Sequence, residues 1–309
     1  MKYAIIFPGQ GSQSVGMLSD LAENFPVVKD TFSFASDVLG FDLWKLSQTD
    51  SDALNQTQNT QPAMLAAGYA TYQVLSNEID LSPVCMAGHS LGEYTALVAS
   101  GSLSFTDGIS LVKKRAQLMQ SAVPVGVGAM AAILGLSDED VVAVCNEYSG
   151  EGIVEAVNFN ATGQVVIAGN KGAVELTCES MKQAGAKRAL LLPVSVPSHC
   201  SLMSEAAIEF SKTVNETEFK MGDVDVIHNF DAKVASDIDD IKYKLVAQLH
   251  KPVLWTGTVK SIHSMGAEKL IESGPGKVLA GLTRRIEKSL TANALIDSDS
   301  VAKTIEEIL

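Results

Sequence analysis

The sequence predicts an α/β protein with a mainly parallel sheet flanked by helices, and three observations lead to this prediction. Short apolar runs that end at Pro or Gly are typical of buried strands. Longer segments with bulky residues at helical spacing alternate with these runs, which favours parallel strands. The chain has 309 residues, 46% of them hydrophobic and 19% charged, which is enough for one large core and a second, small domain.

The first 125 residues contain strands and helices in alternation. Lys2–Phe7 and the apolar run Pro83–Gly88 are predicted strands, because each is β-rich or apolar and runs into a turn. Pro62–Leu75 is alanine-rich with bulky residues at helical spacing, and Gly92–Ser100 and Thr106–Ala122 show the same pattern. These three segments are predicted helices.

A separate unit is predicted at residues 126–196. Its elements follow the order strand, helix, strand, strand, helix, strand, which is the split arrangement of ferredoxin-like domains. The segments that carry this order are Ala129–Leu134, the helix opened by Ser137, Ile153–Asn158, Gln164–Ala168, Gly172–Ala184 and Ala189–Val194. We therefore expect a small domain at 126–196, inserted into a larger domain formed by 1–125 and 197–309.

The larger unit resumes after Val196 with further alternating elements. The predicted segments are a helix at Leu202–Val214, a strand at Val224–Asn229, a helix at Ile241–Leu249 and a strand at Lys269–Glu272. The last strand leads into a Gly-rich turn that opens another helix. Beyond it, we expect the C-terminal tail to add only a short amphipathic helix.

Composition and charge exclude several classes of function. The net charge of −13 argues against nucleic-acid binding, which needs a basic face. No apolar stretch reaches the roughly 18 residues that would span a bilayer, and the first run is too short for a secretory signal. Four widely spaced cysteines indicate reduced thiols rather than a metal site: Cys85, Cys145, Cys178 and Cys200. We expect a cytoplasmic protein without a metal.

The run Gly88-His89-Ser90-Leu91-Gly92 is the strongest chemical signal in the chain. A G-x-S-x-G motif occurs by chance in many proteins, often only as a turn or a helix cap. Here a predicted strand precedes it and a predicted helix follows, which is the context of the nucleophile elbow in α/β-hydrolase-like cores. We expect Ser90 to be a nucleophile, with the backbone N–H of Leu91 at the helix start as an oxyanion donor.

A serine nucleophile needs a base, and five histidines are available. His89 is expected to point away along the elbow, as a packing or turn residue. His199 lies on the proline-fixed loop where the small unit returns to the large one, and loops at such junctions line clefts. We therefore favour His199 over His228, His250 and His263.

The Gly-rich stretch Gly9–Gly16 follows the first strand and resembles a nucleotide-binding loop. It fits neither nucleotide motif: the dinucleotide fingerprint needs Gly where Ser14 stands, and the P-loop needs Lys where Met17 stands. We expect this loop to bring the backbone N–H of Gln10 opposite the elbow as a second oxyanion donor.

Over nearly its whole length, the chain resembles the malonyl-CoA:acyl carrier protein transacylases of bacterial type II fatty-acid synthesis. The order of the motifs together carries the resemblance. The motifs are Phe7-Pro8-Gly9-Gln10-Gly11-Ser12-Gln13, Thr60-Gln61-Pro62-Ala63, Gly88-His89-Ser90-Leu91-Gly92-Glu93-Tyr94, Arg115, Gly128-Ala129-Met130, Asn158 to Gln164, Val196-Pro197-Ser198-His199 and Gln248-Leu249.

The resemblance implies a role for each matching residue. Ser90 would be the nucleophile and His199 its base, with the backbone carbonyl of Gln248 holding the imidazole where many hydrolases use Asp. Arg115, which otherwise reads as part of a basic helical face, would bind the free carboxylate of the malonyl group. The positions expected to line the substrate pocket are Gln10, Gln61, Met119, Met130, Asn160 and Ser198.

The implied reaction is malonyl transfer from malonyl-CoA to the phosphopantetheine of acyl carrier protein, with no dissociable cofactor and a monomeric enzyme. Two basic groups are candidates for docking the acidic carrier protein: Lys187 with Arg188, and Lys277 with Arg284 and Arg285. A serine hydrolase using the same elbow remains the main alternative. A non-catalytic scaffold that keeps the fold is the second alternative.

Overall fold

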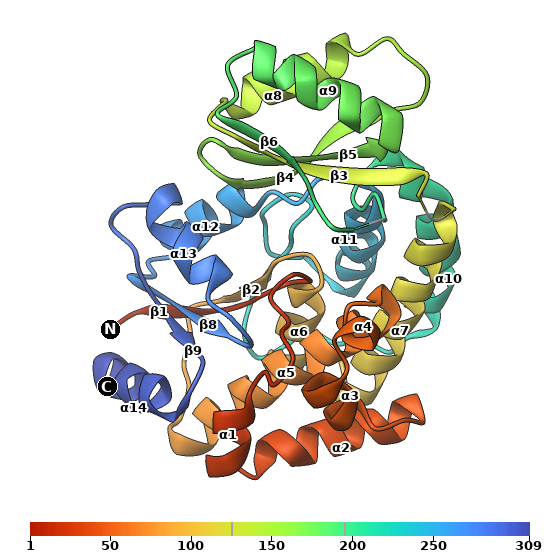
Figure 1. Ribbon diagram of the computed structural model, residues 1–309. Helices are drawn as coiled ribbons and strands as arrows, with labels where there is room; N and C mark the ends of the chain where they lie inside the picture. The colour runs from red at the N-terminus through yellow and green to blue at the C-terminus, as the bar shows by residue number, and fades with distance from the viewer. Residues whose placement is uncertain (125, 195) are drawn as a thin grey trace.

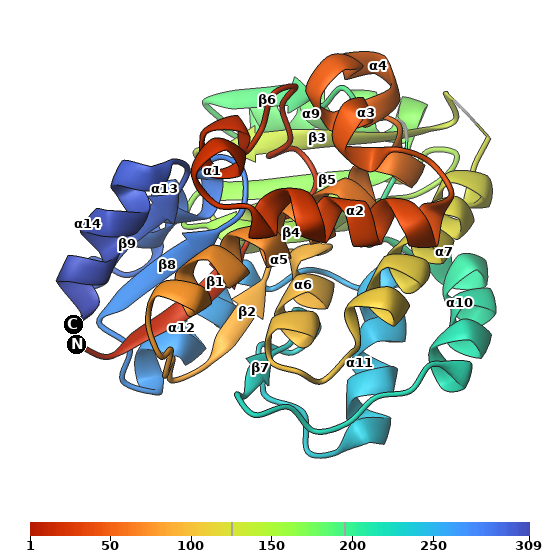
Figure 2. The ribbon, with the colours of Figure 1, turned by 90° about the horizontal axis from the view of Figure 1, so that it is seen from below.

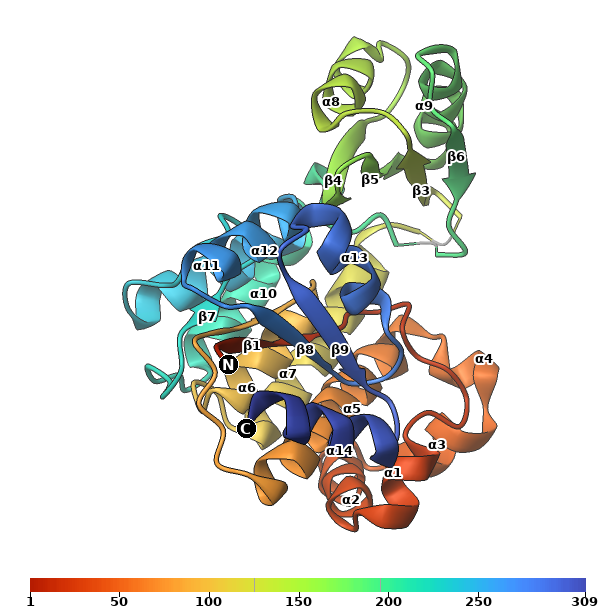
Figure 3. The same ribbon diagram turned by 90° about the vertical axis from the view of Figure 1, so that its left-hand side faces the viewer.

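The computed structural model describes residues 1–124, 126–194 and 196–309, and it contains two sheets (Figure 1). A five-stranded sheet with most of the helices forms the larger unit. A four-stranded sheet with two helices lies above it (Figure 3). In the described part of the chain, no helix is both long and apolar enough to cross a membrane.

The five strands of the larger sheet are all parallel, which confirms the predicted fold class. Their order is β7-β2-β1-β8-β9, and Figure 2 shows them side by side in one twisted sheet. Their bounds are β1 Tyr3–Phe7, β2 Met86–Gly88, β7 Val226–Ile227, β8 Lys269–Ser273 and β9 Thr291–Leu295. The first four are buried throughout, as expected for parallel strands covered on both faces.

Alternation along β1 divides the core between the two faces of this sheet. Ile5 and Phe7 pack into the larger hydrophobic cluster, whereas Ala4 and Ile6 pack into a second cluster that contains Trp255. The helices of this unit are α1 Ser19–Asn24, α2 Val27–Leu39, α3 Leu43–Thr49, α4 Ser51–Leu54, α5 Thr57–Glu78, α6 Gly92–Ala99, α7 Phe105–Ala122, α10 Ser204–Glu216, α11 Ile238–His250, α12 Trp255–Ser264, α13 Val278–Ile286 and α14 Ser298–Ile308, with a 3₁₀ turn at Ser201–Met203.

The second sheet is antiparallel and has the predicted ferredoxin-like arrangement. Its strand order is β4-β5-β3-β6, and the chain runs through β3, α8, β4, β5, α9 and β6. The bounds are β3 Gly128–Leu134, α8 Asp138–Glu147, β4 Val154–Ala161, β5 Gln164–Asn170, α9 Lys171–Gln183 and β6 Arg188–Leu191. One face packs against α8 and α9, and the other carries Met130 and Val166 toward Cys200 of the larger unit.

Three expectations about individual elements are wrong. The C-terminal tail adds a strand, β9, as well as a helix, because pairing with β8 selects a segment whose own composition is not strand-like. Helix α5 begins at Thr57, five residues before the expected start, since Pro62 in its second turn removes only one backbone hydrogen bond. The expected strand at Val224–Asn229 is limited to the two residues of β7.

Candidate active site

Ser90 lies on a sharp turn between β2 and α6. Its φ of 51° is in the left-handed region, where a non-Gly residue is strained. The turn also requires its two glycines: a Cβ on Gly88 would lie 1.9 Å from the Gly92 backbone, and a Cβ on Gly92 would lie 2.1 Å from the Phe7 carbonyl oxygen. These contacts give the geometry that the motif predicts, with the Ser90 side chain presented at the carboxyl end of the sheet.

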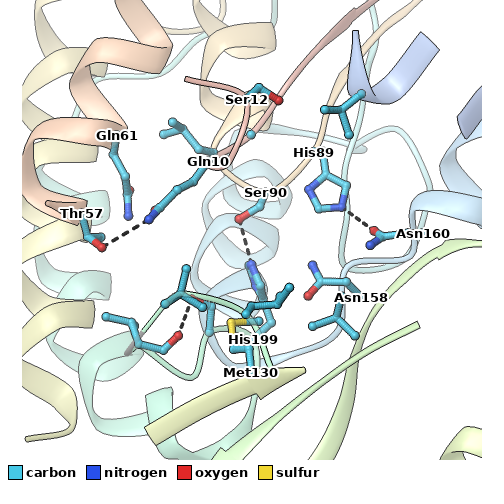
Figure 4. A pocket seen from close by; sticks show the side chains of 18 of the residues that line it. Gln10, Ser12, Thr57, Gln61, His89, Ser90, Met130, Asn158, Asn160 and His199 are labelled. Carbon is cyan, nitrogen blue, oxygen red and sulfur yellow. Dashed lines mark hydrogen bonds between the residues drawn. The ribbon is translucent and has the colours of Figure 1, made fainter. Parts of the chain in front are cut away.

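His199 lies directly opposite this serine (Figure 4). Ser90 Oγ and His199 Nε2 are 2.8 Å apart. On the other side of the ring, Nδ1 is 2.6 Å from the backbone carbonyl oxygen of Gln248. Since a carbonyl only accepts hydrogen bonds, Nδ1 carries the proton and Nε2 is free to accept the serine proton.

The loop that carries His199 is held in place by its backbone. The residue has a φ of 65°, and its N–H donates to the Leu249 carbonyl oxygen at 3.0 Å. Two residues of one short segment, Gln248 and Leu249, therefore hold the imidazole and its backbone. The ring is buried, so few alternative orientations are open to it.

The surroundings of His199 keep its imidazole neutral. Burial, together with the nearby Arg115 charge, lowers the pKa of His199 to about 3, although the hydrogen bond to the Gln248 carbonyl opposes the shift. A neutral imidazole is the form that accepts a proton. The base form is therefore present throughout the neutral and mildly acidic range.

We expect Ser90 to react with an uncharged serine-directed reagent, such as phenylmethylsulfonyl fluoride, at a nearly constant rate down to about pH 5, because the pKa of His199 lies near 3. The measurement is the pseudo-first-order rate of mass gain as a function of pH. His199→Ala serves as the control and should react slowly at every pH. A rate that halves near the ordinary histidine pKa of about 6.5 would contradict this expectation.

Arg115 projects from α7 into the same place. Its Nη1 donates to Gln61 Oε1 at 2.8 Å, and its Nη2 donates to Gln248 Oε1 at 2.9 Å and to Ser90 Oγ at 3.3 Å. The guanidinium lies over the Tyr94 ring at 5.3 Å from its centroid. All of these partners are neutral, and within the described ranges no carboxylate lies within 4.0 Å of Arg115.

A buried cation without a paired anion is costly, because removal from water destabilises the charge. Arg115 is only 1% exposed, so little water compensates it. The site therefore presents a positive charge within hydrogen-bond distance of the serine hydroxyl. An anionic substrate group would complete it.

A cavity of about 240 Å³ opens beside Ser90 and draws its walls from both units. The loop after β1, α5, α7 and α13 contribute on one side, and β3, β4 and β5 contribute on the other. The residues expected at the substrate pocket all border this cavity: Gln10, Gln61, Met119, Met130, Asn160 and Ser198. Gln10 and Leu91 both border the cavity, and in the described residues neither backbone N–H donates to another protein group.

Comparison with known proteins agrees with this geometry. A family model described as acyl transferase domain matches residues 4–301. The malonyl CoA-acyl carrier protein transacylase of Escherichia coli strain K12 is 49% identical, with 99% of each chain covered. The transacylase of the same name from Haemophilus influenzae is 50% identical over 100% of this chain and 99% of its own.

The chain belongs to the malonyl-CoA:acyl carrier protein transacylase family. Solved structures of family members superpose closely on it. The acyl carrier protein S-malonyltransferase from Vibrio cholerae has a TM-score of 0.96 and 53% identity, covering 98% of this chain and 100% of its own. A malonyl-transacylase solved in complex with its type II PKS acyl-carrier protein has a TM-score of 0.98 and 49% identity, covering 99% and 100%.

One expectation about the elbow of this transacylase fold is wrong. His89 does not turn away from the site: its ring lines the cavity, packs edge-on against Trp255, and has Nε2 2.8 Å from Asn160 Oδ1 of β4 (Figure 4). The left-handed turn at Ser90 breaks the simple alternation of a strand, on which the expectation depended. His89 thus links the elbow to the small sheet.

The sequence also gave no sign of a buried polar cluster beneath the elbow of this family member. Asn229 accepts from the Ser90 N–H with Oδ1 at 2.6 Å and donates from Nδ2 to the Gly88 carbonyl oxygen at 2.7 Å. Glu93 and His228 lie behind it, with His228 Nδ1 2.7 Å from Glu93 Oε1. Asn229 follows β7, which is next to β2 in the sheet, so strand order was the one signal that could have indicated it.

Proposed function

We propose that this chain transfers the malonyl group of malonyl-CoA to the phosphopantetheine thiol of acyl carrier protein, through a malonyl-Ser90 intermediate. This transfer would supply extender units for fatty-acid biosynthesis. The observation that carries the proposal is the buried guanidinium of Arg115, which has no carboxylate within 4.0 Å among the described residues and lies 3.3 Å from the serine hydroxyl that His199 contacts. Full-length relatives at about half identity are named for the same reaction.

The first half-reaction forms the acyl-enzyme. Ser90 Oγ attacks the thioester carbonyl while its proton moves to His199 Nε2, and the carbon–sulfur bond then breaks. The proton passes from His199 to the departing sulfur, which leaves as CoA. In the second half-reaction, the carrier thiol gives its proton to His199 and attacks the malonyl ester, and Ser90 regains a proton. Both half-reactions use Ser90 and His199.

The negative charge that develops on the carbonyl oxygen needs donors already in place. We propose that the backbone N–H groups of Leu91 and Gln10 supply them, since both border the cavity and no other protein group uses them in the described residues. Leu91 directly precedes α6, so the positive end of that helix adds to the stabilisation.

Substrate selection would depend on Arg115, whose planar guanidinium can bind a carboxylate through two parallel charge-assisted bonds. The remaining lining positions would set the shape of the acyl site: Gln10, Gln61, Met119, Met130, Asn160 and Ser198. Ser198 is small, which leaves room for a branched acyl group such as methylmalonyl.

Intact mass spectrometry tests this function. The protein incubated with malonyl-CoA should gain one malonyl mass, and that mass should appear on added holo acyl carrier protein. Acetyl-, butyryl- and methylmalonyl-CoA in the same assay define the acyl preference. Rapid release of free malonate without carrier protein would instead identify a hydrolase, and absence of any adduct would identify a non-catalytic protein.

A basic rim beside the cavity is proposed to dock the carrier protein. Arg285 Nη1 donates to Oε1 of Gln164, a cavity residue, at 2.5 Å. Gln164 pairs with Leu134, which pairs in turn with Arg188, so these basic side chains share one end of the small sheet. The proposed docking residues are all exposed: Lys187, Arg188, Lys277, Arg284 and Arg285.

Charge reversal of Arg284 and Arg285 to Glu should raise the KM for carrier protein by about tenfold or more and weaken the salt dependence of transfer. The measurement is the transfer rate against carrier concentration at low and moderate ionic strength. Lys212→Glu, on α10, is the control for each single reversal, because it changes the net charge by the same amount at a distant exposed position. An unchanged KM with an unchanged salt dependence would remove these arginines from the docking surface.

We further propose that the chain acts as a monomer in the cytoplasm, without a dissociable cofactor and without binding nucleic acid or membranes. The net charge of −13 supports the exclusion of nucleic acid. We also propose that residues 126–196 form the inserted domain, since the small sheet has its own hydrophobic cluster. Residue 125, at the first boundary, lies outside the described residues.

A further inference from the structure

Glu93, in the first turn of α6, is buried at 0% exposure beneath the elbow. Three donors surround its carboxyl group. The Asn229 N–H and Gln248 Nε2 donate to Oε2 at 2.9 Å and 2.8 Å, and His228 Nδ1 lies 2.7 Å from Oε1. Neither the proposed proton transfers nor the proposed carboxylate binding uses this group directly.

The side chain of Gln248 has only one amide orientation that fits its neighbours. Its Nε2 faces two groups that can only accept, Glu93 Oε2 and the Ser90 carbonyl oxygen, the latter at 2.9 Å. Its Oε1 faces Arg115 Nη2, which can only donate, at 2.9 Å. A flipped amide would place its NH₂ group against the Arg115 donor and its oxygen against the two acceptors, Glu93 Oε2 and the Ser90 carbonyl oxygen.

Arg115 is therefore held from two directions by amide oxygens. Gln248 Oε1 fixes Nη2, and Gln61 Oε1 fixes Nη1 at 2.8 Å. If the Gln248 amide were free to rotate, Nη2 would lose its acceptor for part of the time and the guanidinium would lose its orientation. A misoriented planar fork binds a carboxylate poorly, because the paired geometry gives the bond much of its strength.

We propose that Glu93 is a positioning residue that fixes the amide of Gln248, and through it Arg115, so that this site prefers acyl groups bearing a carboxylate. The proposal rests on the proposed malonyl transfer. Glu93 touches no reacting atom: it supplies the side-chain acceptor that, together with the Ser90 carbonyl oxygen, sets the direction of the Gln248 amide. The main-chain carbonyl of Gln248 that orients His199 is a different atom, so loss of the amide orientation leaves that contact in place.

The ratio of malonyl to acetyl acylation separates this role from general support of the elbow. Glu93 also holds Asn229, which accepts from the Ser90 N–H, but a change at Ser90 affects both acyl groups alike and cancels in the ratio. Only the path from Glu93 through Gln248 to Arg115 distinguishes the two substrates, since the acetyl group has no carboxylate for Arg115 to bind.

The experiment measures kcat/KM for acylation by malonyl-CoA and by acetyl-CoA in four variants, together with the melting temperature of each. Glu93→Met, which removes the carboxylate and leaves only the Ser90 carbonyl oxygen to accept from the Gln248 amide, should lower the malonyl-to-acetyl ratio about tenfold. Glu93→Gln is the conservative variant: its oxygen can still accept from Asn229 and Gln248, and its NH₂ can donate to His228 Nδ1 once that imidazole carries its proton on Nε2. It should keep the ratio within about twofold of the wild type.

Gln248→Met removes the amide and keeps the main-chain carbonyl, so it should lower the ratio to the same extent as Glu93→Met. It also decides the proposal if Glu93→Met does not fold. Glu307→Gln, a carboxylate that binds Lys269 and Asn293 near the C-terminus, is the control and should leave the ratio unchanged.

An unchanged ratio in Gln248→Met, or in Glu93→Met if it folds, would overturn the proposal. An equal loss in Glu93→Gln and Glu93→Met would also overturn it, because charge rather than hydrogen-bond direction would then govern the preference. The wild type keeps this test separate from the proposed function. If it forms no malonyl adduct, malonyl transfer itself fails. If it does and the variants keep its ratio, only the role of Glu93 fails.

Discussion

Ser90→Ala will gain no malonyl mass when incubated with malonyl-CoA, and its transfer to carrier protein will fall by roughly 10⁵-fold or more. The reason is that Ser90 Oγ is the atom that His199 Nε2 contacts, at 2.8 Å, and the atom to which Arg115 Nη2 donates. Without this oxygen, no acyl-enzyme intermediate can form for the carrier-protein thiol to attack. Intact mass and a discontinuous transfer assay measure the two quantities.

Ser198→Ala is the matched control, because Ser198 lines the same cavity one residue from His199 and its hydroxyl lies 3.5 Å from the Val196 carbonyl oxygen. This variant should still become malonylated. A malonyl adduct on Ser90→Ala would transfer the nucleophile role to another residue, and peptide mapping would then locate it.

Arg115→Ala will lower kcat/KM for malonyl-CoA by roughly 10- to 150-fold, the equivalent of about 1.5 to 3 kcal/mol for a hydrogen bond to a charged group. Acetyl-CoA will be used relatively better, because its acyl group gains nothing from the guanidinium. The burial of Arg115 and its neutral partners make this one of the largest expected effects outside the Ser90–His199 pair. Acylation rates with the two CoA esters measure it.

Two further substitutions sharpen this test. Arg115→Lys keeps the charge and loses the planar fork, so we expect a malonyl preference between those of the wild type and Arg115→Ala. Lys114→Ala changes the neighbouring basic residue on α7 and should keep the wild-type preference. An unchanged malonyl-to-acetyl ratio in Arg115→Ala would refute the carboxylate-binding role.

The sequence predicted the parts of the fold that local patterns determine. The apolar run of β1, the strand–turn–helix at the elbow and the order of elements in the small sheet all have signatures in adjacent residues. Strand β9 could not be predicted this way, because its sequence Thr-Ala-Asn-Ala-Leu has only one β-branched residue and no aromatic residue. Its conformation follows from pairing with β8, which is a tertiary contact.

The residues of the candidate site also fall into those with a local sequence signature and those that only tertiary contacts bring together. Ser90 has a local motif, and His199 lies on a recognisable junction loop. The orienting group of His199 is a main-chain carbonyl, which any residue could supply, so only resemblance to a family pointed to Gln248. Glu93, His228 and Asn229 meet because β7 adjoins β2, and composition and spacing do not encode that adjacency.

The neutral carbonyl behind His199 has a consequence for the choice of acceptor. A buried imidazole that rests on a carbonyl rather than a carboxylate, with a pKa of about 3, is a feeble proton acceptor. A thiol, with a pKa of about 8.5, gives up its proton far more readily than water, whose pKa is about 15.7. Ser90 is itself a poor acid, but its Oγ is held 2.8 Å from Nε2 and accepts a hydrogen bond from Arg115 Nη2. For an acceptor that arrives from solution without such contacts in place, a weak base suffices for a thiol and is poorly suited to activate water. Protection of the acyl ester from hydrolysis can therefore begin in the chemistry of the base itself.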